Sequence, residues 1–133
     1  MRISAFRTAI LALVVIGHSL PAAAQVDQQR AQEFFKDVQA VCDREGQRLW
    51  GMSMCAPMVI ADLRTQTIAT SQPAPEGPRP RGLGILNAPI EWGGATWAAY
   101  MWDTLANAPP RVAKSILLHE LFHGVVQIGR AHV

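Results

Sequence analysis

The sequence has 133 residues, of which 50% are hydrophobic and 17% charged, and its formal net charge is +2. This length corresponds to one domain, and the apolar content excludes a disordered chain because it is sufficient to form a core. So small a charge also excludes the strongly basic surface of a nucleic-acid-binding protein, and we expect no nucleic-acid partner.

Residues 1–24 are typical of a secretory signal peptide. Arg2 and Arg7 form a basic start, residues 9–16 form a short apolar stretch, and residues 21–24 supply the small side chains that a signal peptidase recognises. The apolar run is shorter than the roughly 20 residues of a membrane span. An uncleaved anchor or a buried N-terminal helix is the alternative. We expect an exported protein, periplasmic or extracellular, that starts at Gln25 and keeps no membrane anchor.

Removal of this segment changes the charge balance. The mature chain, residues 25–133, has 109 residues, with 10 basic and 10 acidic side chains, and is formally neutral. Nothing remains that would attract it to nucleic-acid phosphates or to anionic membranes.

The two cysteines, Cys42 and Cys55, both lie in the mature chain. In an oxidising compartment, two cysteines 13 residues apart indicate a structural disulfide rather than a metal-binding pair. Two buried free thiols are the alternative, because pairing cannot be read from sequence alone.

The first predicted element of the mature chain is an amphipathic helix over residues 26–45. Asp27 can cap its N-terminus and Gly46 can end it. The apolar residues recur at helical spacing on one face: Ala31, Phe34, Phe35, Val38, Val41 and Cys42.

Short strands follow this helix. Residues 58–62 and 67–71 predict a hairpin, and the proline-rich residues 72–82 predict an exposed loop. A further strand is expected over residues 83–86, and a turn at residues 87–89.

Residues 96–102 predict another strand after a tight bend at Gly93 and Gly94. Its alternate residues are apolar or aromatic on both faces, which indicates that both faces are covered or that one borders a cleft.

The last predicted element is a helix over residues 111–128 that starts after Pro109 and Pro110. Apolar residues surround its axis almost completely, so we expect it to be buried. His119, Glu120 and His123 lie within it, and polar groups in a buried helix need partners or a metal.

The spacing of these three residues indicates a zinc site. Histidines at i and i+4 lie about 40° apart on a helix, so both imidazoles can bind one Zn²⁺ ion. Glu120, about 100° from His119, lies beside the metal, where it can act as the general base for a zinc-bound water. This is the arrangement of the HExxH motif.

Residues 116–125, with His119-Glu120-Leu121-Phe122-His123 at their centre, resemble the active-site helix of the zincin metallopeptidases. The resemblance implies an α+β fold: a small, twisted, mostly antiparallel sheet with a backing helix, here residues 26–45, and the HExxH helix. It also implies peptide-bond hydrolysis, with a peptide or protein substrate that binds as an added strand at the edge of the sheet.

The chain departs from the zincin pattern at the third metal ligand. A metzincin would have a third histidine where this chain has Gly129, so the resemblance is to gluzincins, whose third ligand is a later glutamate. No acidic residue follows Glu120, and His132 is the one downstream histidine. We therefore expect a zincin N-terminal half, truncated after its active-site helix or degenerate, with an unknown third ligand.

Two alternatives to an active peptidase stay open at this stage. One is a non-catalytic secreted binding or structural domain in which other side chains satisfy the histidines. The other is a metal-binding remnant whose missing ligand comes from a partner chain.

Overall fold

The structure is a computed structural model that describes residues 25–130, without the side chains of residues 46, 49–50 and 126–130. The predicted signal peptide and His132 lie outside the described residues. The described elements, in chain order, are α1 (Gln28–Trp50), β1 (Met58–Asp62), β2 (Thr67–Thr70), β3 (Ala88–Trp92), β4 (Ala95–Met101), α2 (Trp102–Asn107) and α3 (Pro110–Arg130). This arrangement confirms the α+β class.

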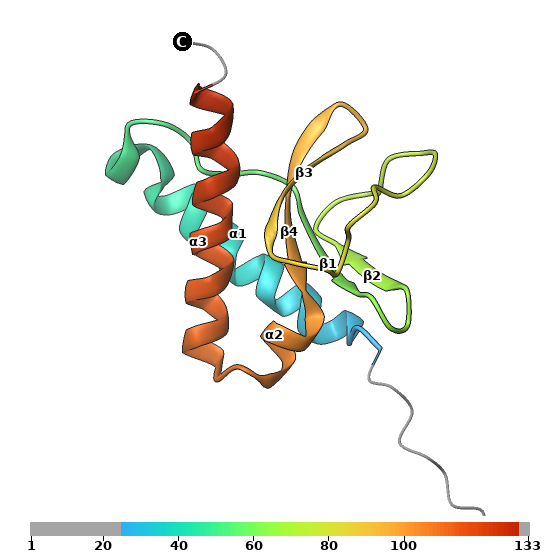
Figure 1. The fold of residues 1–133 in the computed structure, drawn as a ribbon. Helices are drawn as coiled ribbons and strands as arrows, with labels where there is room; N and C mark the ends of the chain where they lie inside the picture. The colour runs from blue at the N-terminus through green and yellow to red at the C-terminus, as the bar shows by residue number, and fades with distance from the viewer. Residues whose placement is uncertain (1–24, 131–133) are drawn as a thin grey trace, which may run out of the picture.

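The four strands form one mixed sheet in the order β2-β1-β4-β3 (Figure 1). β1 is antiparallel to β2 and parallel to β4, and β3 is antiparallel to β4. The predicted hairpin over residues 58–71 is therefore confirmed. β4 lies inside the sheet, and the two edges are β2 and β3.

The chain between β2 and β4 differs from its prediction in two places. Residues 83–86 form turns rather than a strand, and Gly84 has φ +81° and lies so close to the backbone that an added Cβ would be 2.8 Å from Leu63 N. The turn predicted at residues 87–89 is also wrong, because Ala88 and Pro89 begin β3. Proline fits there because β3 is an edge strand, whose outward N–H groups need no ladder partner.

Both faces of the sheet are covered, as the aromatic pattern of residues 96–102 predicted. On one face α1 and α3 lie side by side (Figure 1), and Phe35, Tyr100 and Leu117 share a core cluster. The opposite face holds a smaller cluster around Trp92 and Trp97, against which Leu83 packs. The expected tight bend is the two-residue turn at Gly93 and Gly94, which have φ +60° and +77°.

The first helix begins as predicted and ends later than predicted. The side chain of Asp27 accepts a hydrogen bond from Arg30 N at 3.0 Å. Gly46 does not end α1, which continues for one more turn to Gly51, where φ is +70° and the N–H donates to Gln47 O. Gly51 is the terminator because it adopts the left-handed conformation that closes a helix, whereas a helical glycine such as Gly46 costs only about 1 kcal/mol.

Cys42 and Cys55 form a disulfide, with their Cα atoms 5.5 Å apart. It ties the last turns of α1 to the segment that leads into β1. The pairing confirms the expected disulfide and excludes free thiols and a cysteine metal pair in this state.

None of the helices in the described part of the chain combines the length and the apolar content that a membrane crossing requires.

Candidate metal centre

The predicted motif helix is α3, which starts at Pro110 and buries a single face. Ala113, Leu117 and Leu121, spaced four residues apart, are almost fully buried against the sheet and α1. The expectation that the helix is buried on all sides is wrong: Val112 is 49% exposed, and His119 and His123 are exposed. Only one face of α3 meets the rest of the molecule, so its other apolar residues remain partly open to solvent.

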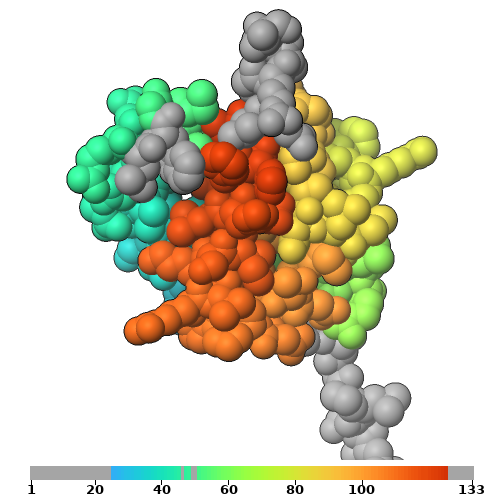
Figure 2. Space-filling view, turned by 60° about the vertical axis from the view of Figure 1, so that its left-hand side comes forward, coloured from blue at the N-terminus to red at the C-terminus, as the bar shows by residue number. Residues whose placement is uncertain are grey.

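The two histidines converge on one point outside the helix. His119 Nε2 and His123 Nε2 lie 2.9 Å apart, and the two rings meet edge to face with centroids 4.5 Å apart. Figure 2 shows α3 along the surface of the molecule, between the C-terminal half of α1 and the β3–β4 hairpin. The pair is therefore preformed and reachable from solvent.

Glu120 lies on the sheet side of α3. Burial raises the pKa of the Tyr100 hydroxyl, and the negative charge of Glu120 raises it further, which places the carboxylate near this β4 residue. Tyr100 also donates a hydrogen bond to Leu117 O at 2.8 Å. Thus β4 holds α3 one turn before the motif and close to Glu120.

The edge strand β3 lies beside the same part of α3. A Cβ added to Gly124 would be 3.8 Å from Pro89 Cβ, an ordinary van der Waals contact. Glu120, four residues earlier, is about 40° from Gly124 around the helix, whereas His123 and His119 are about 100° and 140° away. The acid therefore faces the edge strand, and the histidines face outward beside it.

The two imidazoles fit a zinc ion as part of its ligand set. Two ligands of a tetrahedral zinc at about 2.0–2.1 Å lie about 3.3 Å apart, a separation that small rotations of these exposed rings can reach. Within the described residues, the one group of three close potential ligands is Cys42, Asp43 and Cys55, whose cysteines are disulfide-bonded. The described residues thus provide two ligands, and the predicted weak candidate His132 lies outside them.

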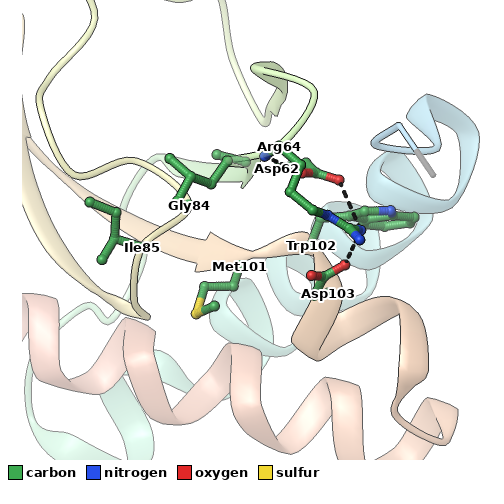
Figure 3. Close-up of a pocket in the computed structure, with 9 residues that line it drawn as sticks. Asp62, Arg64, Gly84, Ile85, Met101, Trp102 and Asp103 are labelled. Atoms are coloured by element: carbon green, nitrogen blue, oxygen red, sulfur yellow. Dashed lines mark hydrogen bonds and ion pairs between the residues drawn. The ribbon is translucent and has the colours of Figure 1, made fainter. Parts of the chain in front are cut away.

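A second polar cluster, which the sequence did not predict, lies at the opposite end of β1 from the disulfide. Asp62, Arg64 and Asp103 line an open pocket of about 180 Å³ there (Figure 3). Their positions 39 and 41 residues apart show no motif spacing. The one local signal is an aspartate at a strand end followed by a turn.

Comparisons of the chain with protein-family models, with curated proteins and with solved structures find no match.

Proposed function

We propose that the chain is an exported, zinc-dependent metallopeptidase-like protein. His119 and His123 bind the zinc ion, and Glu120 is the general base in peptide-bond hydrolysis. The proposal rests on the 2.9 Å convergence of the two Nε2 atoms on an exposed face of α3, with Glu120 next to them on the side of the sheet edge.

The roles follow from the position of each side chain. Zinc, when bound, supplies a Lewis acid that polarises a peptide carbonyl and activates water. Glu120 accepts the proton of the attacking water and passes it to the leaving amine. Its place between the histidines and β3 suits this transfer, because the substrate would lie along that strand.

The edge of β3 offers backbone groups for an extended peptide. Ala98, which lies opposite Pro89, donates its N–H to Pro57 O on the far side of β4. Pro89 and Glu91 therefore direct their backbone polar groups away from β4, as non-hydrogen-bonded positions of an antiparallel pair do. A peptide added as a strand can pair with the Glu91 N–H and C=O and the Pro89 C=O.

The other edge of the sheet is occupied. Gln28 Nε2 donates to Ile68 O at 3.0 Å and Gln32 Nε2 donates to Thr70 O at 3.2 Å. These two side chains of α1 cover the outward carbonyls of β2. Of the two edges of the described sheet, β3 is the one that can take a peptide, and it is also the one beside α3.

The two-ligand site favours one alternative. A catalytic zinc site ordinarily has three protein ligands and an open position, and the described residues supply two. A metal-binding domain that is completed by a ligand from outside the described residues, and that is inactive without it, is therefore the second candidate. A non-catalytic binding domain is the outcome if no metal binds.

The test is a zinc measurement followed by a cleavage assay. The disulfide-bonded mature chain is loaded with zinc without reductant, so that Cys42 and Cys55 cannot bind it, and bound zinc is counted by elemental analysis. We expect one zinc per chain in the wild type and loss of that zinc in His119→Ala. Ser115→Ala, an exposed change one turn earlier on the same helix, is the matched control and keeps the zinc.

Glu120→Gln separates binding from chemistry. The amide cannot accept the proton, so we expect full zinc content and a loss of peptide cleavage of about 10²–10⁴-fold. Zinc binding without cleavage in the wild type supports the two-ligand alternative. Absence of zinc from the wild type contradicts both metal proposals.

A further inference from the structure

The pocket beside Asp62 has walls from three separate segments. They are the β1–β2 turn, the turn that contains Gly84 and Ile85, and the junction of β4 with α2 (Figure 3). Its volume of about 180 Å³ corresponds to about six water molecules at roughly 30 Å³ each. The close packing of Gly84 against Leu63 N leaves no room for a side chain and keeps one wall of the pocket in place.

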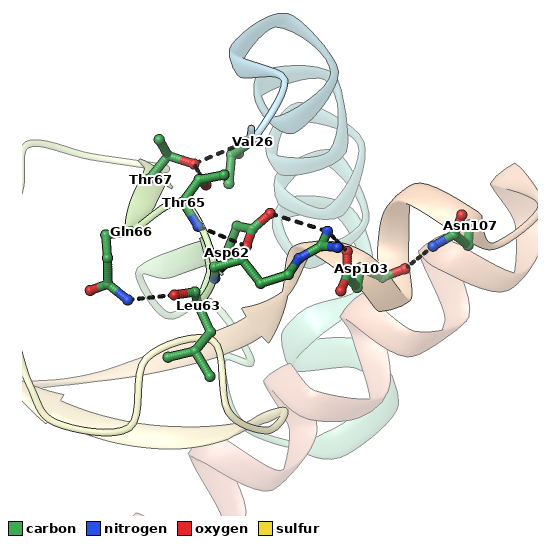
Figure 4. Close-up of polar contacts among 9 residues, drawn as sticks. Val26, Asp62, Leu63, Thr65, Gln66, Thr67, Asp103 and Asn107 are labelled. Atoms are coloured by element: carbon green, nitrogen blue, oxygen red, sulfur yellow. Dashed lines mark hydrogen bonds and ion pairs between the residues drawn. The ribbon is translucent and has the colours of Figure 1, made fainter. Parts of the chain in front are cut away.

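Asp62 is a buried carboxylate that uses only one of its oxygens for structure. Its side chain is 2% exposed. Oδ1 accepts hydrogen bonds from Arg64 N at 2.7 Å and Thr65 N at 3.3 Å, which close the β1–β2 turn (Figure 4). No described residue donates a hydrogen bond to Oδ2. A buried acceptor without a donor is costly, so this oxygen is available to a ligand.

The charges that line the pocket do not balance. Arg64 Nη2 bonds to Asp103 Oδ1 at 2.8 Å and is 3.8 Å from Asp62 Oδ2, too far for a hydrogen bond (Figure 4). One guanidinium therefore faces two carboxylates, and the charged residues that line the pocket sum to −1. A positively charged ligand would neutralise this excess.

The other end of the pocket is apolar. Ile85 and Met101 lie there, away from the charged cluster (Figure 3), and the large side chains of Leu63 and Ile85 are 49% and 54% exposed. An alkyl chain laid across these side chains would cover apolar surface that now faces water.

We propose that this pocket binds a primary ammonium group that carries an alkyl chain. Asp62 Oδ2 accepts from the ammonium, and Leu63 and Ile85 contact the chain. A compact ammonium suits a single free oxygen, whereas a guanidinium would need both oxygens for its bidentate contact. A divalent cation would need more oxygen ligands, and Asp62 and Asp103 belong to no three-ligand group within the described residues.

The experiment is an NMR titration of the disulfide-bonded mature chain with hexylamine, which is protonated at neutral pH. We expect saturable shifts of the Leu63, Gly84 and Ile85 amides. Hexanol, which has the same chain without the charge, should bind at least about tenfold more weakly, because it lacks the charge contact with Asp62. N-acetyl-lysine methylamide is the second probe: if it binds as well, the site takes lysine side chains, and if hexylamine alone binds, it takes free amines.

Three variants make the assignment specific. Asp62→Asn keeps Oδ1 for the turn but loses the charge, and should weaken hexylamine binding about tenfold. Arg64→Gln removes the competing cation and should strengthen it by a similar factor. Asp37→Asn, an exposed change on α1, is the control for net charge and should leave the affinity unchanged.

The proposal is overturned by any of three results: no saturable binding to the wild type, equal affinity for hexanol, or unchanged affinity in Asp62→Asn. If Asp62→Asn does not fold, Arg64→Gln decides, because an unchanged or weaker affinity there contradicts the competition between the two cations. None of these measurements depends on zinc, so this pocket and the metal centre can fail independently.

Discussion

Tyr100 joins the sheet to the helix that bears the histidine pair. It is fully buried, and its hydroxyl donates to Leu117 O at 2.8 Å. Burial, and secondarily the charge of Glu120, raise its pKa above the ordinary value, so the phenol stays neutral in the folded protein at neutral pH.

This raised pKa predicts a loss of stability in alkali. Above pH about 10, the tyrosine of the unfolded chain ionises while the buried one keeps its proton. The unfolded state then binds fewer protons than the folded state, so the free energy of unfolding falls as pH rises from about 10 toward the folded-state pKa. Urea unfolding at several pH values measures this fall.

Tyr100→Phe is the control for this titration. It should lower stability by about 1 kcal/mol at neutral pH, through the lost hydrogen bond, and should lack the alkaline loss due to the phenol. The sequence has a single tyrosine, so the ultraviolet absorbance of phenolate follows Tyr100 alone. Titration near pH 10 in the folded protein would contradict the prediction.

Gly84 and Gly82 separate backbone strain from steric contact. Both have positive φ, +81° and +94°, but an added Cβ meets Leu63 N at 2.8 Å only at Gly84, and meets nothing within 4 Å at Gly82. We expect Gly82→Ala to cost about 1–2 kcal/mol from conformation, and Gly84→Ala to cost about 1–3 kcal/mol more from the forced shift. Denaturant unfolding of both variants measures the difference, and equal losses would contradict the close approach.

At the scale of elements, the disulfide holds the C-terminal turns of α1. Cys42 and Cys55 are separated by 13 residues, and a loop of this size is stabilised by about 3 kcal/mol in the chain-entropy treatment. We expect reductant to lower the melting temperature and to speed hydrogen exchange at residues 43–51. The double variant Cys42→Ala/Cys55→Ala should show both effects without reductant. If reductant shifts the double variant as well, the effect does not arise from this bond.

At the scale of the whole molecule, the fold does not depend on the metal centre. The larger core cluster joins α1, α2, α3 and the sheet, and neither histidine is part of it. We therefore expect the chelated protein to remain folded. Zinc at a hundredfold excess over its Kd should raise the free energy of unfolding by about 2.7 kcal/mol, because it binds only the native state.

Thermal melts with chelator and with zinc test this expectation. His119→Ala should lose the zinc-dependent rise and Ser115→Ala should keep it. Unfolding by chelator alone would contradict an independent fold, and an equal rise in His119→Ala would place the stabilising zinc elsewhere.

Several features of this protein were predictable from sequence because they depend on neighbouring residues. The N-cap of α1, the β1–β2 hairpin, the tight turn at Gly93 and Gly94, and the four-residue spacing of His119 and His123 all follow from local backbone geometry. The Cys42–Cys55 pair followed from count and spacing. Local signals failed where two glycines competed to end α1, since Gly51 and not Gly46 takes the left-handed conformation.

Other features were decided only by the tertiary structure, because they depend on which distant segments meet. Strand pairing placed β4 inside the sheet and left β3 as the edge beside α3. Packing against one side only left His119 and His123 exposed on a helix whose apolar pattern predicted burial. The Asp62 pocket needs three segments that the chain brings together from residues 61–64, 84–85 and 101–103. Sequence alone thus determined the ligand pair, whereas long-range packing determined what faces it.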